Sequence, residues 1–473
     1  MASKRDQLQA YQFLIQRATS ALVLRETDPE QLPFRRPAAA SYAGVALAII
    51  ALACFGVYGM IVPGGANTWR QDNVVIVEKE TGTRYVWTQG RLHPVTNYAS
   101  ALLLVGTHGK TERVSRDSLV GVPRGPRLGI PDAPDALPGA DRLLTGAWSL
   151  CSSPATDVTG GRVDESVLLV GTAPTGGWSL GEQALPVQLA PSGERFLIWR
   201  GHRHPLNDYA TVGAGLALTT LPWVRVGQAW LDVVPSGAPI EPIATPDAGR
   251  PSTAIAGRTD LRIGALLVVQ ASGGKQYYLA ERDTLRPITE LQYDIQRAYP
   301  PTLAAYPGAE PYAIDLAPSS AAAAPQPSPV TDPAPPARPE IAQLPGREAT
   351  VCTTFAPGEA IPRLTVDPAL PPADPMAVTI RRTSTGTPLA DRVYVPPGWA
   401  AVVEAMPSPQ ALAGTLTVIT DLGRRYPVAS PEVLGMLGYR ADRAVRLPAS
   451  LVARLPDGPG LDPEAARRQS LSG

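Results

Sequence analysis

Two of the four histidines in the chain, His202 and His204, could share a metal ion. Residues two apart in a strand point to the same face, and imidazole nitrogens are common zinc ligands. His204, however, directly precedes a proline, as His93 does, and Arg286 and Tyr426 hold the same position in similar stretches. A position that accepts histidine, arginine or tyrosine indicates a structural role, so we predict no metal site.

Other residue patterns offer little catalytic chemistry. Gly109-Lys110-Thr111 matches the end of a phosphate-binding loop, but that pattern needs a glycine where this chain has Leu104. Gly273-Gly274-Lys275 lies between two β-rich runs and indicates a hairpin turn, while Glu78 and Glu80 have the spacing of solvated strand residues. The motifs of serine hydrolases and zinc proteases are missing from the sequence. We therefore predict no catalytic residues and no cofactor, and keep ATP as an alternative ligand.

Charge and composition narrow the class of protein. Lys+Arg and Asp+Glu both number 42, which gives no net charge and argues against a nucleic-acid partner. The 52 prolines and 43 glycines disfavour long helices and favour short strands, turns and linkers.

One segment has the composition of a membrane span. Tyr42 to Val62 contains no charged residue, and Pro63 follows it. A helix of this length reaches about 30 Å, the hydrocarbon thickness of a bilayer. The preceding segment is rich in basic residues, whereas Arg70 is the first one after the span. The positive-inside rule thus predicts a single-pass protein of the plasma membrane, with residues 1–41 in the cytosol and the bulk of the chain extracytoplasmic.

The cytosolic segment is predicted to begin with an amphipathic helix over residues 4–25. Ser3 and Asp6 fit a capping box, and Asp28-Pro29 ends the helix. The helix either lies on the inner leaflet or, as we favour, docks on a cytosolic partner. Its apolar residues recur at spacings of three and four on one face: Leu8, Tyr11, Ile15, Ala18 and Leu22.

Two of the three cysteines fall in the extracytoplasmic part, which is an oxidising setting. Cys54 lies within the span, so Cys151 and Cys352 remain as a pair. We predict a disulfide between them, which would close a loop of about 200 residues and stabilise the fold by about 4–5 kcal/mol in the chain-entropy model.

The extracytoplasmic part contains four degenerate repeats. Each has a β-rich run, a turn, the proline described above, an aliphatic residue and a polar cap. A second, proline-containing block follows three of them, from Leu119, Trp230 and Leu451, but is not evident after the third. The expected ranges are 63–141 for repeat 1, 187–249 for repeat 2, 250–315 for repeat 3, and 414–473 for repeat 4 with a C-terminal tail.

Segments between the repeats could form a common central sheet, because a pair of repeat strands is too small to be stable alone. We expect central-domain segments at 142–186 and 347–413, with strands at Val167–Val170, Ala377–Ile380 and Arg392–Val395, and consider Arg250–Gly264 a further contributor. Residues 316–346 are rich in proline and alanine and predict an extended linker. The fold class is thus one transmembrane helix plus a mainly-β (α+β) extracytoplasmic body of repeats around a central β domain.

The sequence resembles EccB, the membrane component of actinobacterial type VII (ESX) secretion machines. The resemblance covers essentially the whole chain. It rests on Tyr11, Phe13 and Arg17 in the first helix, on the ALV segment and basic pair that follow, and above all on the block from Thr81 to Gly106. It implies repeat domains in quasi-two-fold arrangement, membrane partners like EccC, EccD and EccE, self-association through the body, and an indirect role in export of WXG-type substrates.

Three functions follow as expectations. The first is a structural and assembly subunit that scaffolds the extracytoplasmic side of a type VII secretion complex. The second is an extracytoplasmic ATP hydrolase, because ATP hydrolysis has been assigned to members of this family. The third is a cell-wall-binding module, for which exposed aromatics such as Trp87 and Trp199 would be candidates, although strand tryptophans are more often core residues.

Overall fold

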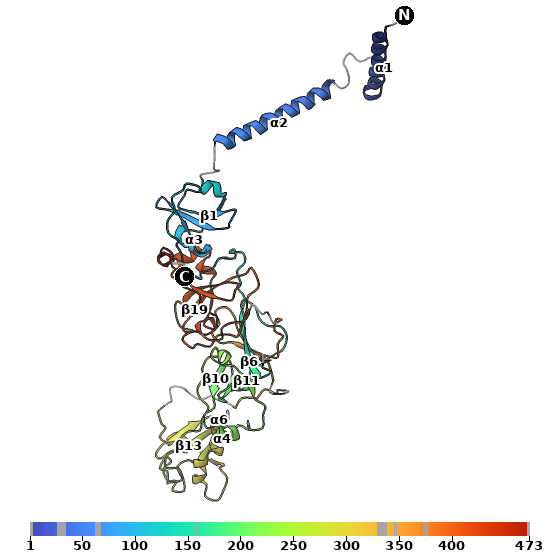
Figure 1. Ribbon diagram of the computed structural model, residues 1–473. Helices are drawn as coiled ribbons and strands as arrows, with labels where there is room; N and C mark the ends of the chain where they lie inside the picture. Colours follow the sequence, from blue (N-terminus) through green and yellow to red (C-terminus); the bar gives the residue numbers. More distant parts are fainter. Residues whose placement is uncertain are drawn as a thin grey trace.

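The computed structural model describes residues 3–25, 35–61, 68–157, 159–328, 338–344, 346, 348–372, 374 and 377–470. Two long helices precede a body built from several small sheets (Figure 1). Asp28-Pro29, Val62 and the middle of the expected linker, 329–337, lie outside the described residues.

The two N-terminal helices match the expected cytosolic helix and span. Helix α1, Lys4–Leu24, begins with a capping box between Ser3 and Asp6 and ends at Arg25 in the left-handed conformation. Helix α2, Arg35–Ile61, contains the stretch Ala38–Tyr58, which has a mean hydropathy of 2.1 and is fully exposed. Among the described residues this is the one helix with the length and composition to cross a bilayer.

Four sheets of the body share one topology. Three antiparallel strands are followed by a helix and by a fourth strand, which pairs in parallel with the first strand of its repeat. In repeat 1 the strand order is β3-β2-β1-β4. Its elements are β1 Val74–Glu78, β2 Arg84–Thr88, β3 Arg91–Pro94, α3 Tyr98–Val105, β4 Lys110–Val114 and the 3-10 helix η1 Arg116–Leu119.

The other repeats follow the same order of elements. Repeat 2 has β8 Leu185–Leu189, β9 Arg195–Trp199, β10 His202–Pro205, α4 Tyr209–Gly215, β11 Val224–Val226 and α5 Gln228–Leu231. Repeat 3 has β12 Leu266–Ala271, β13 Gly274–Ala280, β14 Leu285–Ile288, α6 Glu290–Ala298, η2 Pro300–Ala305, β15 Ala313–Asp315 and α7 Pro318–Ala323. Repeat 4 has β19 Ala401–Met406, β20 Thr415–Ile419, β21 Arg425–Pro427, α8 Pro431–Met436, η4 Ala441–Arg443, β22 Val445–Pro448, α9 Ala449–Val452 and α10 Pro463–Ala466.

The polar cap of each repeat starts its crossover helix. The side chains of Asn97, Asp208, Thr289 and Ser430 each accept a hydrogen bond from a backbone N–H in the first turn of α3, α4, α6 and α8. Such a cap satisfies an N–H group that has no partner within the helix. The third strand of every repeat therefore runs directly into a helix.

The second block lies along the outer edge strand of the sheet. A backbone N–H group of that strand donates a hydrogen bond to the carbonyl group of a proline in the block. The N–H of Leu92 donates to the carbonyl of Pro123 at 2.8 Å, and Arg203 donates to Pro235 at 2.8 Å. Repeat 4 has the same contact from Arg425 to Pro456 at 3.0 Å. These contacts cover an edge strand that would otherwise present unpaired polar groups.

Repeat 3 has the same contact, although the sequence analysis found no second block after this repeat. The N–H of Leu285 donates to the carbonyl of Pro325 at 2.7 Å, so the stretch expected to open the linker completes the repeat instead. Leu316, Ala321 and Ala324 pack into the core of repeat 3. The block is hard to see in the sequence because small alanines, rather than valine or leucine, fill its buried positions.

The central sheet has six strands in the order β18-β6-β5-β16-β17-β7. Val167–Val170 overlaps β6 and Arg392–Val395 overlaps β18, and Val378 forms a bridge to Arg392. Arg250–Gly264 instead contributes to the core of repeat 3. The strands are β5 Trp148–Thr156, β6 Arg162–Leu169, β7 Trp178–Ser179, β16 Val351–Phe355, β17 Arg363–Val366 and β18 Arg392–Tyr394.

Two strands expected near the central domain pair within repeats. β8 begins inside the range 142–186 but pairs with β9, and β19 lies inside 347–413 but pairs with β20. Each also pairs in parallel with the last strand of its repeat. Strands with neighbours on both sides are buried, and their apolar runs do not reveal which sheet they join.

The predicted disulfide joins the two chain segments of the central sheet. Cys151 on β5 and Cys352 on β16 are direct cross-strand partners, their Cα atoms lie 4.0 Å apart, and both are fully buried. The bond spans a sequence separation of 201 residues. Residues before repeat 2 are thereby linked covalently to residues after repeat 3.

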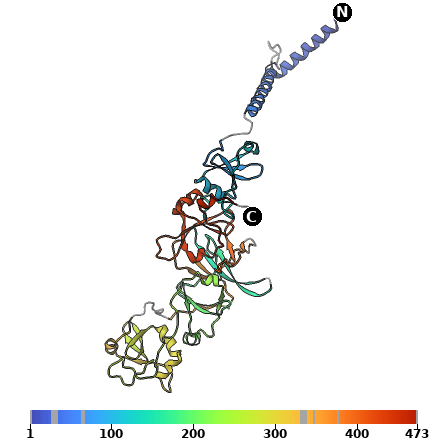
Figure 2. The same cartoon turned by 60° about the vertical axis from the view of Figure 1, so that its left-hand side comes forward.

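The repeats do not follow one another in space as they do in the chain. From the span outwards, the body places repeat 1, repeat 4, the central sheet, repeat 2 and repeat 3 in a row, as both ribbon views show (Figures 1 and 2). Helix α3 packs on α8, and α4 packs on α6. The chain therefore runs to the distal end and returns, and Gln469 pairs with Leu128 of repeat 1.

Candidate functional site

Three of the four histidines, His93, His202 and His204, place Nδ1 against a backbone carbonyl of their own repeat. His93 and His204 are buried, and their Nδ1 atoms lie 3.0 Å from the carbonyl oxygen of Pro126 and 2.8 Å from that of Ala238. The ring of His202 is 6.5 Å from that of His204. Across the described residues no group of three or more His, Cys, Asp or Glu side chains could hold a metal ion.

In repeats 1 and 2 the residue before the proline at the end of the third strand is a histidine, and its ring packs on a glycine of the second block. A Cβ atom added to Gly125 would lie 2.1 Å from the His93 ring, and one added to Gly237 would lie 2.4 Å from His204. Each of these glycines lies two residues after the proline whose carbonyl group accepts the hydrogen bond from the edge strand. The ring therefore fills the space that the missing side chain leaves.

Repeat 4 has the same arrangement and repeat 3 does not. A Cβ atom on Gly458 would lie 2.2 Å from the Tyr426 ring. In repeat 3 the ring position holds Arg286, which pairs with Glu281 at 2.6 Å, and Pro327 stands where the glycine would be. The spacing of proline and glycine in the second blocks carried this signal in the sequence, and our sequence analysis missed it.

Glu78 is a buried ion-pair partner, not the solvated residue that we expected. Its carboxylate accepts hydrogen bonds from Arg116 at 2.9 Å and from Tyr85 at 3.1 Å. The Arg116 guanidinium holds the pKa of Glu78 below its usual value, and burial raises the pKa of Tyr85. The expectation failed because Arg116 is distant in sequence and reaches Glu78 only when β4 pairs with β1.

The residues that suggested a phosphate-binding loop belong to a sheet. Gly109 follows helix α3, and Lys110 and Thr111 begin strand β4. Lys110 pairs with Glu112 at 3.0 Å. A phosphate-binding loop precedes a helix and offers its backbone N–H groups to the ligand, whereas this stretch leads into a strand. Gly273 and Gly274 lie at the β12–β13 turn, as predicted.

The two strand tryptophans offer little exposed surface. Trp199 is 5% exposed and donates from Nε1 to the carbonyl of Glu182 at 2.9 Å. Trp87 is half-buried and meets Trp69 edge to face at a centroid distance of 5.7 Å. Both pack in cores, as strand tryptophans usually do.

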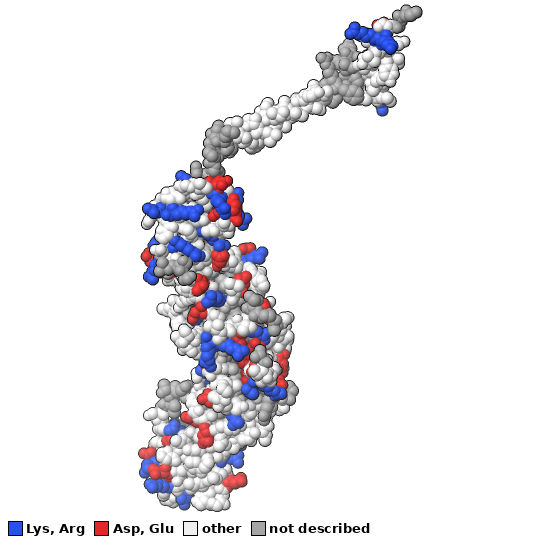
Figure 3. All heavy atoms as spheres, viewed as in Figure 1, with Lys and Arg blue, Asp and Glu red and all other residues white. Residues whose placement is uncertain are grey.

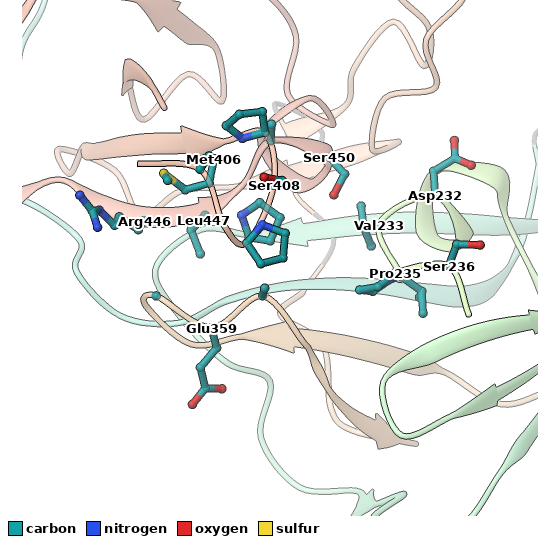
Figure 4. Close-up of a pocket in the computed structure, with 18 of the residues that line it drawn as sticks. Asp232, Val233, Pro235, Ser236, Glu359, Met406, Ser408, Arg446, Leu447 and Ser450 are labelled. Carbon is teal, nitrogen blue, oxygen red and sulfur yellow. The ribbon is translucent and has the colours of Figure 1, made fainter. Parts of the chain in front are cut away.

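A cleft of about 430 Å³ lies where repeat 2, the central sheet and repeat 4 meet (Figure 4). Val233 and Pro235 come from repeat 2, whereas Met406 and Leu447 come from repeat 4. Ser236, Ser408 and Ser450 add hydroxyl groups, so the lining mixes apolar and polar surface. The close-up shows the charged ends of Arg446, Glu359 and Asp232 directed away from the centre of the cleft.

The charged residues at this cleft have partners within the chain. Arg446 contacts Glu404 at 2.8 Å, and Glu359 contacts Arg363 at 3.2 Å. Asp232 lies 3.5 Å from both Arg203 and the buried Arg454, whose pKa burial lowers. A triphosphate would have to displace these carboxylates to gain the arginines. The cleft thus suits an uncharged group better than a nucleotide.

Comparison with known proteins then decides the family. Residues 1–471 match the family described as "Type VII secretion system ESX-1, transport TM domain B", EccB. The chain belongs to the EccB family. It is 27% identical over 509 residues to the ESX-2 secretion system ATPase EccB2 of Mycobacterium tuberculosis H37Rv, covering 98% of this chain and 94% of the relative. Against the ESX-5 secretion system ATPase EccB5 of the same strain the identity is 27% over 480 residues, with 97% and 92% covered.

Chains in solved structures of ESX complexes share the fold. A chain of an intact ESX-5 inner membrane complex superposes with a TM-score of 0.62 at 24% identity, covering 100% of this chain and 96% of that one. The EccB3 dimer from the ESX-3 core complex gives a TM-score of 0.60 at 24% identity, covering 84% and 100%. The expected fold class of an apolar N-terminal helix followed by a mainly-β body is confirmed.

The first helix of this EccB chain presents an uncovered apolar face. Tyr11 is 64% exposed, Ile15 is 44% exposed and Leu22 is 83% exposed, and Leu8 and Ala18 on the same face are exposed as well. The space-filling view shows blue atoms on α1 and an uncharged surface along α2 (Figure 3). An amphipathic helix with this face open is suited to docking.

Proposed function

We propose that the chain is an assembly subunit that scaffolds the extracytoplasmic side of a type VII secretion membrane complex. One observation carries the proposal: a row of small sheets, tied into one body by shared cores and a buried disulfide, follows a single apolar helix. Membership of the EccB family supports it. The related structures come from an ESX-5 inner membrane complex and from the ESX-3 core complex.

The proposed topology places α1 in the cytosol and the body outside the plasma membrane. Basic residues concentrate before α2, and the disulfide suits an oxidising compartment. Single-cysteine variants of Cys54→Ser protein in intact cells test this topology. A membrane-impermeant thiol reagent should label Thr81→Cys, at the exposed β1–β2 turn, and should not label Gln9→Cys until the cells are opened. The reverse pattern contradicts the proposal.

Partners are proposed to be membrane components like EccC, EccD and EccE, together with a second copy of this chain. The test is affinity purification of the tagged full-length protein from its native membrane in mild detergent, followed by mass spectrometry. We expect such components in one large particle. Recovery of the protein by itself would count against the assembly function and would favour the second candidate function described below.

The open face of α1 is proposed to dock on a cytosolic partner in that complex. Tyr11→Asp with Ile15→Asp should reduce the recovery of partners, because two charges would be buried in the contact. Gln9→Asp with Gln16→Asp, on the opposite side of α1, is the matched control and should purify like the wild type. Equal recovery of partners with both pairs of substitutions would exclude docking through this face.

ATP hydrolysis is a second candidate function, favoured by the names of the ESX-2 and ESX-5 relatives, both of which are called ATPases. The described residues of this chain show no loop or cluster that we would assign to it. The test is phosphate release by the purified full-length protein, compared with Arg203→Ala and Arg446→Ala variants at the cleft. Hydrolysis that both variants abolish would favour this candidate.

A further inference from the structure

Repeat 1 carries an excess of positive charge that the chain as a whole does not have. Residues 68–127 contain nine Lys or Arg and five Asp or Glu, whereas the full sequence has equal numbers of the two. Figure 3 shows blue atoms gathered on the left side of the body just below α2. The acidic residues that follow, from Asp132 onwards, belong to the stretch in which Ile130 and Ala133 enter the core shared with repeat 4.

Backbone pairing aligns several arginines along the outer edge of this repeat. Leu92 of the edge strand β3 pairs in parallel with Arg124 of the second block. The N–H of Ser470 donates to the carbonyl of Arg127 at 3.0 Å, which brings the C-terminal segment onto the same edge. Four exposed arginines thus follow one edge and are called the arginine strip: Arg91, Arg124, Arg127 and Arg468.

The charges of the arginine strip are not balanced by carboxylates of the described residues. Other arginines of the same repeat are paired: Arg84 contacts Asp135 at 2.8 Å, and Arg116 contacts Glu78 at 2.9 Å. An exposed guanidinium without such a partner can pair with an anion outside the chain. Phosphate groups suit it best, because the planar guanidinium can donate two parallel hydrogen bonds to them.

The fold of the repeat does not require arginine at this edge. Arg124 stands between Pro123, which accepts the hydrogen bond from the edge strand, and Gly125, on which the His93 ring packs. The residue after the corresponding proline is Ser236 in repeat 2, Gln326 in repeat 3 and Asp457 in repeat 4. Three repeats therefore form the same edge contact without a positive charge here, and the repeat next to the span has one.

Repeat 1 is also held close to the bilayer that α2 is proposed to cross. Helix α2 ends at Ile61 and the described residues resume at Thr68, and seven peptide units span at most about 25 Å. Repeat 1 is the first sheet after α2 in both ribbon views (Figures 1 and 2). Basic residues are attracted to an anionic membrane only within about one Debye length, roughly 8–10 Å, and this short connection allows repeat 1 to come that near.

We propose that the arginine strip binds the phosphate groups of anionic phospholipids in the leaflet that faces the body. The inference rests on the proposal that α2 crosses the bilayer. Four guanidinium groups along one edge can engage several headgroups at once, so individually weak contacts add up. The contact holds one edge of repeat 1 against the membrane and thereby limits how far the row of repeats can tilt.

Full-length protein in lipid nanodiscs tests the contact, because α2 anchors the body in every sample. In a Cys54→Ser background, a donor fluorophore on Gln469→Cys, directly after Arg468, reports energy transfer to an acceptor on lipid headgroups. Transfer should be greater in phosphatidylglycerol than in phosphatidylcholine and should fall in about 0.5 M salt, which screens the charges. A donor on the exposed Lys275→Cys of the distal repeat 3 should show no such difference.

Substitutions in the strip give the second measurement. Arg124→Gln with Arg127→Gln should lower the ratio of docked to undocked body in phosphatidylglycerol by at least about fivefold, because two phosphate contacts are lost. Arg250→Gln with Arg363→Gln is the matched control. It removes the same charge from two exposed side chains in repeat 3 and the central sheet, and it should leave the transfer from Gln469→Cys unchanged.

Each other result overturns the proposal. Equal transfer in the two lipids would show that the strip does not bind anionic headgroups, and an equal loss with strip and control variants would show only an effect of net charge. If the lipids make no difference but the strip variant loses partners in the affinity purification, the strip binds an acidic protein instead. Nanodiscs have no cytosolic side, so these results are independent of the proposed topology, which the thiol labelling tests separately.

Discussion

Repeats 3 and 4 have the same strand order but are joined to the rest of the body in different ways. In repeat 4, Val403 and Ile419 belong to the core of the central sheet, while Val402 and Val418 on the other face belong to the core shared with repeat 1. The core of repeat 3 is its own, and contact with repeat 2 runs through Leu291 and Ile295 of α6.

The comparison shows which features of the repeat depend on its neighbours. Both repeats keep the capped crossover helix and the backbone contact to a proline, because these serve the sheet itself. The ring packed on a glycine is kept in repeat 4 and absent from repeat 3. The backbone contact therefore defines the repeat, and the side chains around it can change.

Removal of the disulfide should produce the largest difference in stability between repeats 3 and 4. Cys151→Ala with Cys352→Ala removes a constraint worth about 4–5 kcal/mol in the chain-entropy model. We expect faster hydrogen exchange in the central strands and in β19 and β20, which share their core, and unchanged exchange in β12 and β13 of repeat 3. Equal loss of protection in both repeats would show that the body unfolds as one unit.

A methyl group on Gly458 should damage repeat 4 alone. The Cβ atom would clash with the buried Tyr426 ring, so Gly458→Ala should lower stability by about 1–3 kcal/mol in urea unfolding. Gly435→Ala in α8 of the same repeat is the control, because nothing lies within 4 Å of the added atom. If both variants unfold alike, the ring is not confined by Gly458.

Transfer of the ring and glycine into repeat 3 tests whether the difference between the repeats lies in these two positions. Arg286→Tyr by itself should destabilise repeat 3, since it removes the ion pair with Glu281 and sets a ring against Pro327. With Pro327→Gly added, a double-mutant cycle should recover about 1 kcal/mol. No coupling between the substitutions would mean that repeat 3 differs more widely.

Buried tyrosines should make the stability of repeats 3 and 4 fall at alkaline pH, by a small and similar amount in both. Tyr306 of repeat 3 donates to the carbonyl of Tyr312, and burial raises its pKa to about 12; burial also raises the pKa of Tyr439 of repeat 4, which donates to Pro138 of repeat 1. A raised tyrosine pKa gives stability that is complete below about pH 10 and is lost as pH rises through the folded-state pKa.

Conservative variants distinguish these two contributions in thermal unfolding followed between pH 9 and pH 11, a range set by the ordinary tyrosine pKa of about 10. Tyr306→Phe should flatten the pH dependence and also cost about 1 kcal/mol at neutral pH through the lost hydrogen bond. Tyr439→Phe should do the same and weaken the contact between repeats 4 and 1. An unchanged alkaline slope in both variants would contradict the assignment.

Sequence alone determined the features that depend on local composition and spacing. The apolar run before Pro63 predicts the span, and the two cysteines outside the span, Cys151 and Cys352, predict their own bond. The position of His204 before a proline predicts a structural role, and the ring is buried in the structure. Each of these signals lies within a few residues, or rests on a pair with no competitor.

Only the tertiary structure decided how distant segments meet. The pairing of repeat 1 with repeat 4 and of repeat 2 with repeat 3, the burial of Glu78 against Arg116, and the closing contact of Leu285 with Pro325 all join residues that are far apart in the chain. Such contacts depend on which sheet each buried strand joins. An apolar run has the same sequence pattern in either sheet, so the pattern does not decide between them. The cleft lined by Val233 and Met406 likewise exists only because repeats 2 and 4 converge on the central sheet.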